Sequence, residues 1–327
     1  MRPFSYLQAS DEGAAVATVA ENPSASFVAG GTEMLNWMKD GIEEPGLLVD
    51  VNALPFKDVE ARGHSVRIGA MCTMSDVASE PAVREAYPAL AEALEASASP
   101  QLRNMATIGG NLLQRTRCPY FRETSFPCNK RSPGSGCSAL AGEHRMHAIL
   151  GASDACVAVH PSDLAVALVA LDAVVHTRGA GGERTIPIDD FYLLPGSAPE
   201  RETVLQHGEL IVGVEVPASP FAARSRYLKV RERASYEFAL VSTAVAIELV
   251  DGTVSSARVA LGGVAPKPWR ARAAEEVLVG GRLDAAAIAA AGAVVVRDAR
   301  PLRDNAFKIR LTERAVVRAL SELGGAA

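Results

Sequence analysis

Four of the five cysteines lie close together in the chain, and their chemistry is the most restricted in the sequence. Nine, eight and eighteen residues separate Cys118, Cys128, Cys137 and Cys156. Structural zinc sites generally use cysteine pairs about two to four residues apart, and this set has none. Four widely spaced thiolates can instead enclose a bulky cluster, and four cysteines are the usual ligands of a [4Fe–4S] cluster. The spacing therefore favours such a cluster, with zinc or an empty, oxidised loop as alternatives.

Other reactive residues near the cysteines have simpler interpretations. The flanking positive charges would favour thiolates, although each is also consistent with solvated surface charge: Arg115, Arg117, Lys130 and Arg131. His144 and His147 form an HxxH pair, a spacing that is common by chance, so we expect both to be structural. Cys72 follows a predicted strand and is expected to be buried as a small apolar side chain.

Two glycine motifs suggest a ligand that carries phosphate. They are Ala29-Gly30-Gly31-Thr32-Glu33 and Ala106-Thr107-Ile108-Gly109-Gly110-Asn111. Paired glycines after a strand allow positive φ and close backbone approach, which turns several N–H groups toward one concavity. Either motif alone usually marks only a tight turn. The sequence lacks both the Rossmann glycine spacing and a Walker A lysine, so another scaffold would hold a pyrophosphate.

The elements that position these motifs are short strands alternating with helices. The periodicity predicts strands at 26–29, 47–51 and 66–70, and helices at 32–39 and 89–96. The segment from Gln114 to Gly142 has neither period, and so long a loop in a compact domain is usually functional or disordered. The three cysteines within it indicate that a bound centre orders it.

The second half of the chain changes character near 217–224, where we place a domain boundary. Before it, we predict a helix at 164–173, a strand at 173–177 and a hairpin turn at the glycine run 179–182. Asp163 opens that helix, either as its N-cap or as a carboxylate that binds ligand hydroxyl groups. After it, an antiparallel meander is predicted at 226–232, 239–250 and 253–262, followed by helices at 273–278, 284–296 and 312–323.

Composition excludes several classes of partner. The 327 residues suffice for two domains, and the hydrophobic fraction of 48% can supply their cores. The net charge of −5 is spread without long runs of one sign, so nucleic acid is not an expected partner. No apolar stretch of about 18 residues is free of charge, so we expect no membrane insertion. We also expect no export signal in this chain.

The glycine motifs, the Ser162-Asp163 step and Lys229 resemble the FAD-binding subunits of the xanthine dehydrogenase family over nearly the whole chain. The resemblance implies an α+β fold with a two-subdomain FAD-binding domain of the PCMH/vanillyl-alcohol-oxidase type. A C-terminal domain of the CO dehydrogenase flavoprotein type, with an antiparallel sheet and a helical bundle, would follow. The implied bounds are 1–220 and 221–327, with subdomains of about 1–55 and 56–220 and a cluster loop at 114–156.

The same resemblance implies a set of FAD contacts. Leu193 and Leu194 would approach the isoalloxazine ring. The remaining implied contacts are Val28, Ala29, Gly30, Gly31, Thr32, Glu33, Ala106, Thr107, Gly109, Gly110, Asn111, Ser162, Asp163 and Lys229.

The local sequence around the cysteines resembles one subgroup of that family, the cluster-bearing flavin subunits of bacterial periplasmic aldehyde oxidoreductases. The resemblance lies in 111–121, in Pro127-Cys128-Asn129-Lys130-Arg131 and in Pro133-Gly134-Ser135-Gly136-Cys137. It implies that Cys118, Cys128, Cys137 and Cys156 hold a [4Fe–4S] cluster. Hydroxybenzoyl-CoA reductase has a similar insertion, and a related molybdenum hydroxylase is therefore an alternative.

The implied activity is electron transfer within a molybdenum-dependent aldehyde oxidoreductase. A large molybdopterin-binding subunit would oxidise the aldehyde to a carboxylic acid, and a small subunit would pass the electrons through [2Fe–2S] clusters. The FAD of this chain would release them to an external acceptor, in a heterotrimer or its dimer. A signal-bearing partner would carry the complex to the periplasm, with a cytoplasmic location as the alternative.

Two other classes of function are also weighed. A stand-alone flavin reductase that uses a nicotinamide donor predicts turnover by the isolated chain and gives the cysteine loop no role. A non-redox interaction subunit with zinc on its cysteines predicts a colourless protein.

Overall fold

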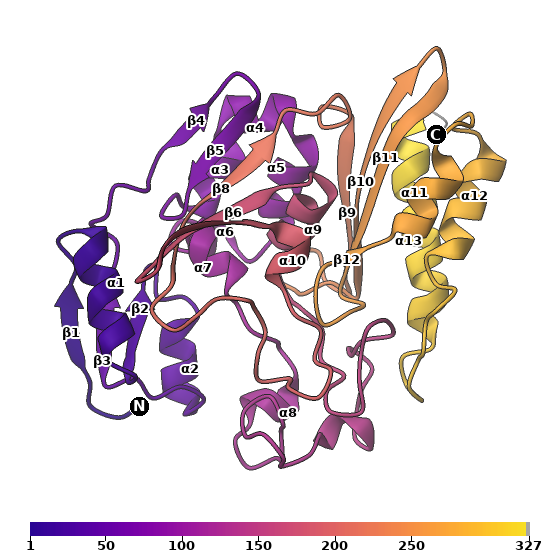
Figure 1. Cartoon of the computed structure of the whole chain (residues 1–327). Helices are drawn as coiled ribbons and strands as arrows, with labels where there is room; N and C mark the ends of the chain where they lie inside the picture. The colour runs from indigo at the N-terminus through magenta and orange to yellow at the C-terminus, as the bar shows by residue number, and fades with distance from the viewer. Residues whose placement is uncertain (325–327) are drawn as a thin grey trace.

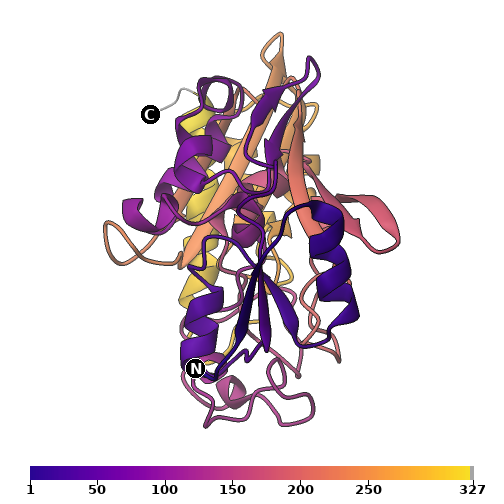
Figure 2. The same cartoon turned by 90° about the vertical axis from the view of Figure 1, so that its left-hand side faces the viewer.

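The N-terminal residues form a small parallel sheet in the computed structural model, which describes residues 1–324 (Figure 1). The sheet contains, in spatial order, β1 (Ser5–Gln8), β3 (Leu47–Asp50) and β2 (Ala25–Val28). Parallel strands need crossover connections, which are here α1 (Glu12–Glu21) and α2 (Met34–Asp40), on opposite sides of the sheet (Figure 2). Asp11 caps α1 by accepting a hydrogen bond of 2.8 Å from the N–H of Ala14.

A five-stranded antiparallel sheet forms the centre of the molecule. Its spatial order is β4 (Val59–Ala61), β5 (Ser65–Gly69), β8 (Leu210–Pro217), β6 (Val174–Gly179) and β7 (Gly182–Pro187). The helices of this part are α3 (Met74–Ser79), α4 (Pro81–Ala86), α5 (Pro88–Ala96), α6 (Pro100–Arg103), α7 (Ile108–Leu112), α9 (Asp163–Ala170) and α10 (Ile188–Phe191). All eight residues of α9 are buried, as its almost wholly apolar sequence requires.

The third sheet is antiparallel and separates two hydrophobic cores. Its spatial order is β12 (Trp269–Arg270), β11 (Thr253–Gly262), β10 (Val241–Val250) and β9 (Ser225–Val230). On β10, Ala244 and Ala246 face the core shared with α5 and α9, whereas Val245 and Ile247 face the core of the C-terminal helices. Small and branched side chains thus alternate along a strand that is buried on both faces. The C-terminal helices are α11 (Arg272–Leu278), α12 (Ala285–Val294) and α13 (Phe307–Gly324).

The cysteine-rich segment lies below both larger sheets in Figure 1. It contains two short helical turns, α8 (Pro119–Arg122) and η1 (Ser138–Leu140), and is otherwise irregular. Hydrogen bonds from one guanidinium hold its first turns together, because Arg131 donates to the carbonyls of Tyr120 and Phe121 over 3.0 and 2.7 Å. The segment is therefore built by side-chain-to-backbone contacts rather than by regular ladders.

The predicted α+β class, with a C-terminal antiparallel sheet and helices, is confirmed. The predicted hairpin is also confirmed, since Gly179 pairs with Gly182 between β6 and β7. The prediction for the last helix was wrong at its start, because α13 begins at Phe307 rather than at 312. The elements that were not predicted are β1, α1, β4, α3, α4, α6, α7, α8, η1, α10, β8 and β12. The last three residues of the predicted C-terminal domain, 325–327, lie outside the described residues, and no helix within 1–324 could cross a membrane.

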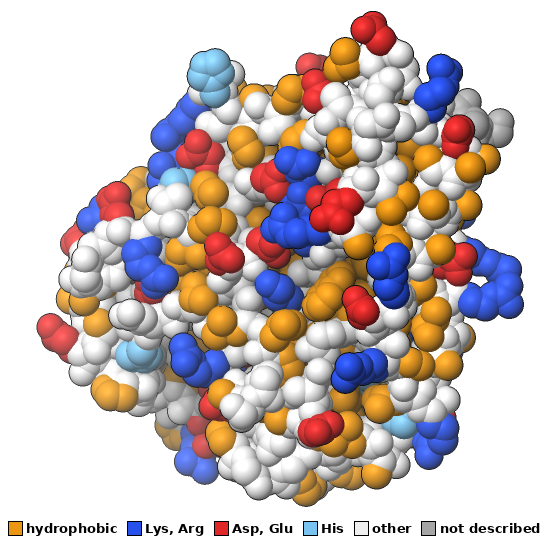
Figure 3. Space-filling model, turned by 45° about the vertical axis from the view of Figure 1, so that its right-hand side comes forward, with side chains coloured by type: hydrophobic (Ala, Val, Ile, Leu, Met, Phe, Trp, Pro, Cys, Tyr) orange, Lys and Arg blue, Asp and Glu red, His pale blue; other side chains and the backbone are white. Residues whose placement is uncertain are grey.

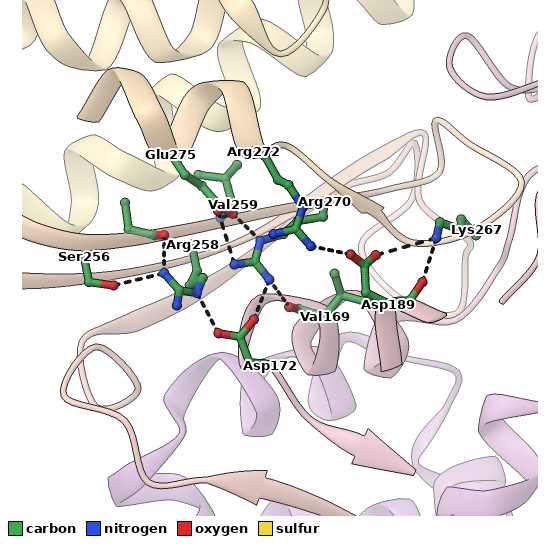
Figure 4. Close-up of polar contacts among 11 residues, drawn as sticks. Val169, Asp172, Asp189, Ser256, Arg258, Val259, Lys267, Arg270, Arg272 and Glu275 are labelled. Carbon is green, nitrogen blue, oxygen red and sulfur yellow. Dashed lines mark hydrogen bonds and ion pairs between the residues drawn. The ribbon is translucent and has the colours of Figure 1, made fainter. Parts of the chain in front are cut away.

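Ion pairs join the C-terminal sheet to the end of α9 (Figure 4). Arg270 on β12 is 2.7 Å from Asp172 and 2.8 Å from the carbonyl of Val169, and it also pairs with Glu275 on α11. Arg258 on β11 reaches the second carboxylate oxygen of Asp172 over 2.7 Å. Oppositely charged side chains lie next to one another on the face shown in Figure 3, instead of gathering by sign.

Candidate functional site

Both glycine motifs border one cleft of about 540 Å³. The first motif ends β2 and leads into α2, and the second leads into α7, so the cleft lies where the small parallel sheet meets the central part. Twelve of the predicted FAD contacts line it: Val28, Ala29, Gly30, Gly31, Thr32, Glu33, Ala106, Thr107, Gly110, Asn111, Asp163 and Lys229.

At both positions of the first glycine pair, steric constraints require glycine. A Cβ on Gly30 would lie 1.8 Å from the carbonyl oxygen of Met105, directly before the second motif, so the two motifs are packed backbone against backbone. Gly31 has a φ of 69°, which disfavours other residues. The prediction that the second pair follows a strand and uses positive φ was wrong. Gly109 and Gly110 lie inside α7, and the Thr107 hydroxyl caps that helix by accepting a hydrogen bond of 3.2 Å from Gly110.

Asp163 and Lys229 meet at one end of the cleft. The Lys229 ammonium lies 2.8 Å from the Asp163 carboxylate and donates to the carbonyl of Ala96 over 3.1 Å. The carboxylate also accepts hydrogen bonds from Ser97 and Tyr227, over 2.8 and 2.5 Å. The N-cap interpretation of Asp163 was wrong, because the Ser162 hydroxyl caps α9. The carboxylate instead joins the central part to β9.

The structure does not bring four predicted FAD contacts to this cleft. Gly109 is buried against Ala70, whose Cβ would be 3.0 Å from a Cβ added to the glycine. Ser162 donates a hydrogen bond of 2.6 Å to the amide oxygen of Asn111, which couples α9 to α7. Leu193 and Leu194 do not line the cleft, and the side chain of Leu194 is 45% exposed. No local motif fixes the register of that leucine pair, and its approach to the isoalloxazine ring stays a prediction.

Residues around the cleft carry buried polar atoms that the described part of the chain leaves without hydrogen-bond partners. These atoms are Nε1 of Trp37, Nε of Arg117 and Oε2 of Glu237. Buried polar atoms are nearly always paired, so their presence fits a ligand with polar groups along its length. Tyr236 and Phe238 border the same cleft and add aromatic surface. An extended dinucleotide such as FAD, with both rings and phosphates, fits this lining.

All four clustered cysteines line one small internal cavity. Cys128 and Cys137 face each other across an isolated antiparallel bridge, which brings two of the four together through backbone pairing. Across residues 1–324, no three His, Cys, Asp or Glu groups converge on a position for a single metal ion. Four thiols around one cavity could ligate either a cluster or a zinc ion, because cysteine is a ligand of both.

Burial dominates the acidity of these thiols. It raises the pKa of Cys118 to about 12, so that thiol stays protonated at neutral pH until a metal displaces the proton. Burial also raises the pKa of Cys156, although the neighbouring charge of Lys130 opposes the shift. Cys72 lies apart in the main core with 2% exposure, which confirms its predicted role as a buried apolar side chain.

The basic residues that flank the cysteines are not solvated surface charges. Arg117 and Arg122 both bind Glu33 of the first glycine motif, with nitrogen–oxygen distances of 2.6 and 2.7 Å. Arg115 and Lys130 bind Glu202 over 2.5 and 3.3 Å. The ion pairs fix the cysteine segment to the first glycine motif and to Glu202, and Glu33 contacts the segment with both its carboxylate oxygens.

A side cavity of about 180 Å³, here called the annex, shares lining residues with both the cleft and the cavity of the cysteines. Arg117, Pro161, Asp163 and Phe238 line both spaces, and Cys118 lines the annex as well as the cysteine cavity. His147 lies in the annex wall with Nε2 3.1 Å from Sγ of Cys118. Sequence reasoning treated this histidine as structural, and only its position beside the cysteines in the chain could have suggested otherwise.

Comparisons with known proteins agree over the whole chain. Residues 2–219 match the family described as the FAD binding domain in molybdopterin dehydrogenase, and residues 226–323 match the CO dehydrogenase flavoprotein C-terminal domain. The aldehyde oxidoreductase FAD-binding subunit PaoB of Escherichia coli K12 is 48% identical, with 98% of each chain covered. The carbon monoxide dehydrogenase medium chain of Hydrogenophaga pseudoflava is 29% identical over 97% of this chain and 96% of that protein.

Solved structures show the same architecture. A carbon monoxide dehydrogenase chain from Hydrogenophaga pseudoflava superposes with a TM-score of 0.78 at 29% identity, covering 100% of this chain and 99% of that one. A chain of quinoline 2-oxidoreductase from Pseudomonas putida 86 shares the fold, with a TM-score of 0.76 at 23% identity and coverage of 99% and 98%. With two family matches that together span nearly all of its length, this chain belongs to the FAD-binding medium subunits of the molybdenum hydroxylase family and is an oxidoreductase subunit.

Proposed function

We propose that this chain is the FAD and [4Fe–4S] electron-transfer subunit of a molybdenum-dependent aldehyde oxidoreductase. One observation carries the proposal: Cys118 borders both the cavity of the four cysteines and the annex of the cleft, so the two cofactor sites adjoin. The 48% identity to a FAD-binding subunit of an aldehyde oxidoreductase supports the aldehyde class of substrate.

The residues of this chain would hold and insulate the cofactors. Gly30 and Gly31 would let the backbone approach the pyrophosphate, and Trp37, Arg117 and Glu237 would offer their unpartnered polar atoms. The four cysteines would ligate the cluster. When bound, FAD exchanges one or two electrons and a [4Fe–4S] cluster exchanges one.

We propose two partners for the chain, as its membership of the medium subunits implies. A large subunit would hold the molybdenum cofactor, and a small subunit would hold [2Fe–2S] clusters and deliver electrons to this chain. An external acceptor would then take them from the flavin. Export to the periplasm with a signal-bearing partner is also proposed.

Analysis of iron, sulfide and flavin in the anaerobically purified complex tests this function. We expect one FAD and four additional iron atoms per copy of this chain, beyond the iron of the [2Fe–2S] subunit. A flavin spectrum without the additional iron would overturn the cluster assignment. A colourless chain that contains zinc would overturn the whole proposal, and turnover of a nicotinamide by the isolated chain would favour a stand-alone reductase.

A further inference from the structure

The imidazole of His147 has an unusual pair of environments. Nε2 is 3.1 Å from Sγ of Cys118, whereas Nδ1 is buried and has no hydrogen-bond partner among residues 1–324. A histidine that merely fills a core usually satisfies both nitrogens. His144, the other member of the HxxH pair, does so: Nδ1 lies 3.1 Å from the carbonyl of Ala139, and Nε2 accepts from the N–H of Asp304 over 3.0 Å.

The direction of the Cys118 contact follows from the chemistry of its two atoms. A cysteine that ligates iron is a thiolate and has no proton to donate. Nε2 must therefore carry the hydrogen and donate it to the sulfur. In a neutral imidazole this tautomer leaves Nδ1 as the free acceptor, which accounts for the nitrogen without a donor partner.

The C-terminal helix holds this histidine in place. Lys308, which is fully buried on α13, donates to the carbonyls of Met146, His147 and Gly263 over 2.9, 3.1 and 2.7 Å. Asn305 donates to the carbonyl of His147 over 3.2 Å. The backbone that carries the imidazole is thereby fixed by two buried side chains from another element, so the Nε2–Sγ contact does not depend on a flexible loop.

We propose that His147 is a positioning residue of the cysteine centre, whose Nε2–H donates to Sγ of Cys118 and raises the reduction potential of the cluster. The inference rests on the proposed function, because it requires a [4Fe–4S] cluster on the four cysteines. Reduction adds one negative charge to the cluster, and a hydrogen bond to a ligating sulfur stabilises the more negative state. Of the four cysteines, Cys118 is the one that borders the annex, so the effect falls on the ligand nearest the flavin cleft.

The test compares three variants in the complete complex by anaerobic redox titration, with the reduced cluster followed by electron paramagnetic resonance. His147→Leu removes the donor at similar size, and His147→Gln places an amide N–H at about the reach of Nε2. His144→Gln is the matched control, since that histidine touches no cysteine sulfur. A neutral hydrogen bond changes an equilibrium by about two- to tenfold, and we expect His147→Leu to lower the ratio of reduced to oxidised cluster by that factor at a fixed potential.

The control variants separate the donor from the shape of the side chain. His147→Gln should recover most of the wild-type ratio, and His144→Gln should match the wild type. The proposal is overturned if His147→Leu keeps its iron with an unchanged titration, or if His147→Gln behaves like His147→Leu. It is also overturned if both His147 variants lose the cluster and keep FAD, since His147 would then be a ligand or a structural residue. Wild-type complex without the additional iron would instead refute the proposed function, before any variant is compared.

Discussion

The Nη1 atom of Arg117 lies 2.6 Å from each carboxylate oxygen of Glu33. Glu33 belongs to the first glycine motif, and Arg117 directly precedes Cys118, the first of the four clustered cysteines. Arg122 adds a third bond, of 2.7 Å, to the same carboxylate, and the Glu33 side chain is only 15% exposed. The wall of the flavin cleft and the cysteine segment are therefore joined by one partly buried ionic contact.

Replacement of Glu33 by Gln should loosen this junction. Removing the anion leaves two partly buried guanidinium groups without their charge partner, which costs about 1–3 kcal/mol in the free energy of unfolding. We expect faster trypsin cleavage within the cysteine segment and a lower denaturant midpoint. Glu43→Gln is the control, since that carboxylate pairs with Arg115 at a more exposed position. Equal proteolysis of Glu33→Gln and the wild type would contradict the prediction.

Cys128→Ser or Cys137→Ser should abolish the cluster iron while leaving much of the FAD bound. Neither cysteine borders the cleft or the annex, so the loss of ligation should not remove a wall of the flavin site. The iron-to-flavin ratio of purified protein measures the effect. Cys72→Ser is the control. Because Cys72 lies in the main core, the protein with this substitution should keep its cluster iron. Parallel loss of both cofactors would show that the cysteine segment is integral to flavin binding.

Gly30→Ala should destabilise the protein and lower its flavin content together. The added Cβ would lie 1.8 Å from a backbone oxygen, so the two glycine motifs would have to move apart. Overpacking of this kind costs about 1–3 kcal/mol. Gly181→Ala is a matched control, since a Cβ there has no neighbour within 4 Å. Thermal unfolding and the ratio of flavin to protein give the two readouts, and an unchanged flavin ratio in Gly30→Ala would argue against a pyrophosphate at this turn.

The ion pairs that Glu202 forms with Lys130 and Arg115 should make the free energy of unfolding depend on pH. Burial alone would raise the pKa of Glu202, but the charges of Lys130 and Arg115 outweigh it and hold the pKa below its ordinary value of 4.5. A folded-state pKa below the unfolded one contributes stability that is present above about pH 4.5 and lost as the pH falls further. Glu202→Gln should therefore be less stable than the wild type at pH 7, and the difference should shrink in acid. Chemical denaturation at several pH values measures it, with the exposed Glu200→Gln as control; a difference that is constant with pH would refute the linkage.

Turns were predicted best from the sequence where the backbone conformation requires glycine. The Gly30-Gly31 turn and the Gly179–Gly182 hairpin need residues with little steric hindrance, and both could be placed from a few letters. Helices α6 and α7 could not, because each spans barely one turn and is stabilised by neighbours. The hydrogen bond of 2.9 Å from the Met74 N–H to the carbonyl of Ala106, directly before α7, comes from tertiary packing.

The candidate site shows the same division. Cysteine spacing sufficed to suggest a cluster, because the type and number of possible ligands can be read directly from the sequence. The roles of Arg117, Arg122 and Lys130 could not be predicted, since their carboxylate partners lie 72 or more positions away in segments that only the fold brings together. The contact between His147 and Cys118 likewise depends on the fold, because Lys308 on α13 donates a hydrogen bond to the carbonyl of His147 and so fixes its backbone.

Helix α9 is held by the C-terminal domain at both of its ends. Tyr227 and Lys229 bind Asp163 at its beginning, and Arg258 and Arg270 bind Asp172 just beyond its end. A helix tethered in this way links the C-terminal sheet to the cleft, because Asp163 at its beginning is part of the cleft lining. A partner that displaced either domain would therefore also change the shape of the flavin cleft, because α9 and its two carboxylates would move with it.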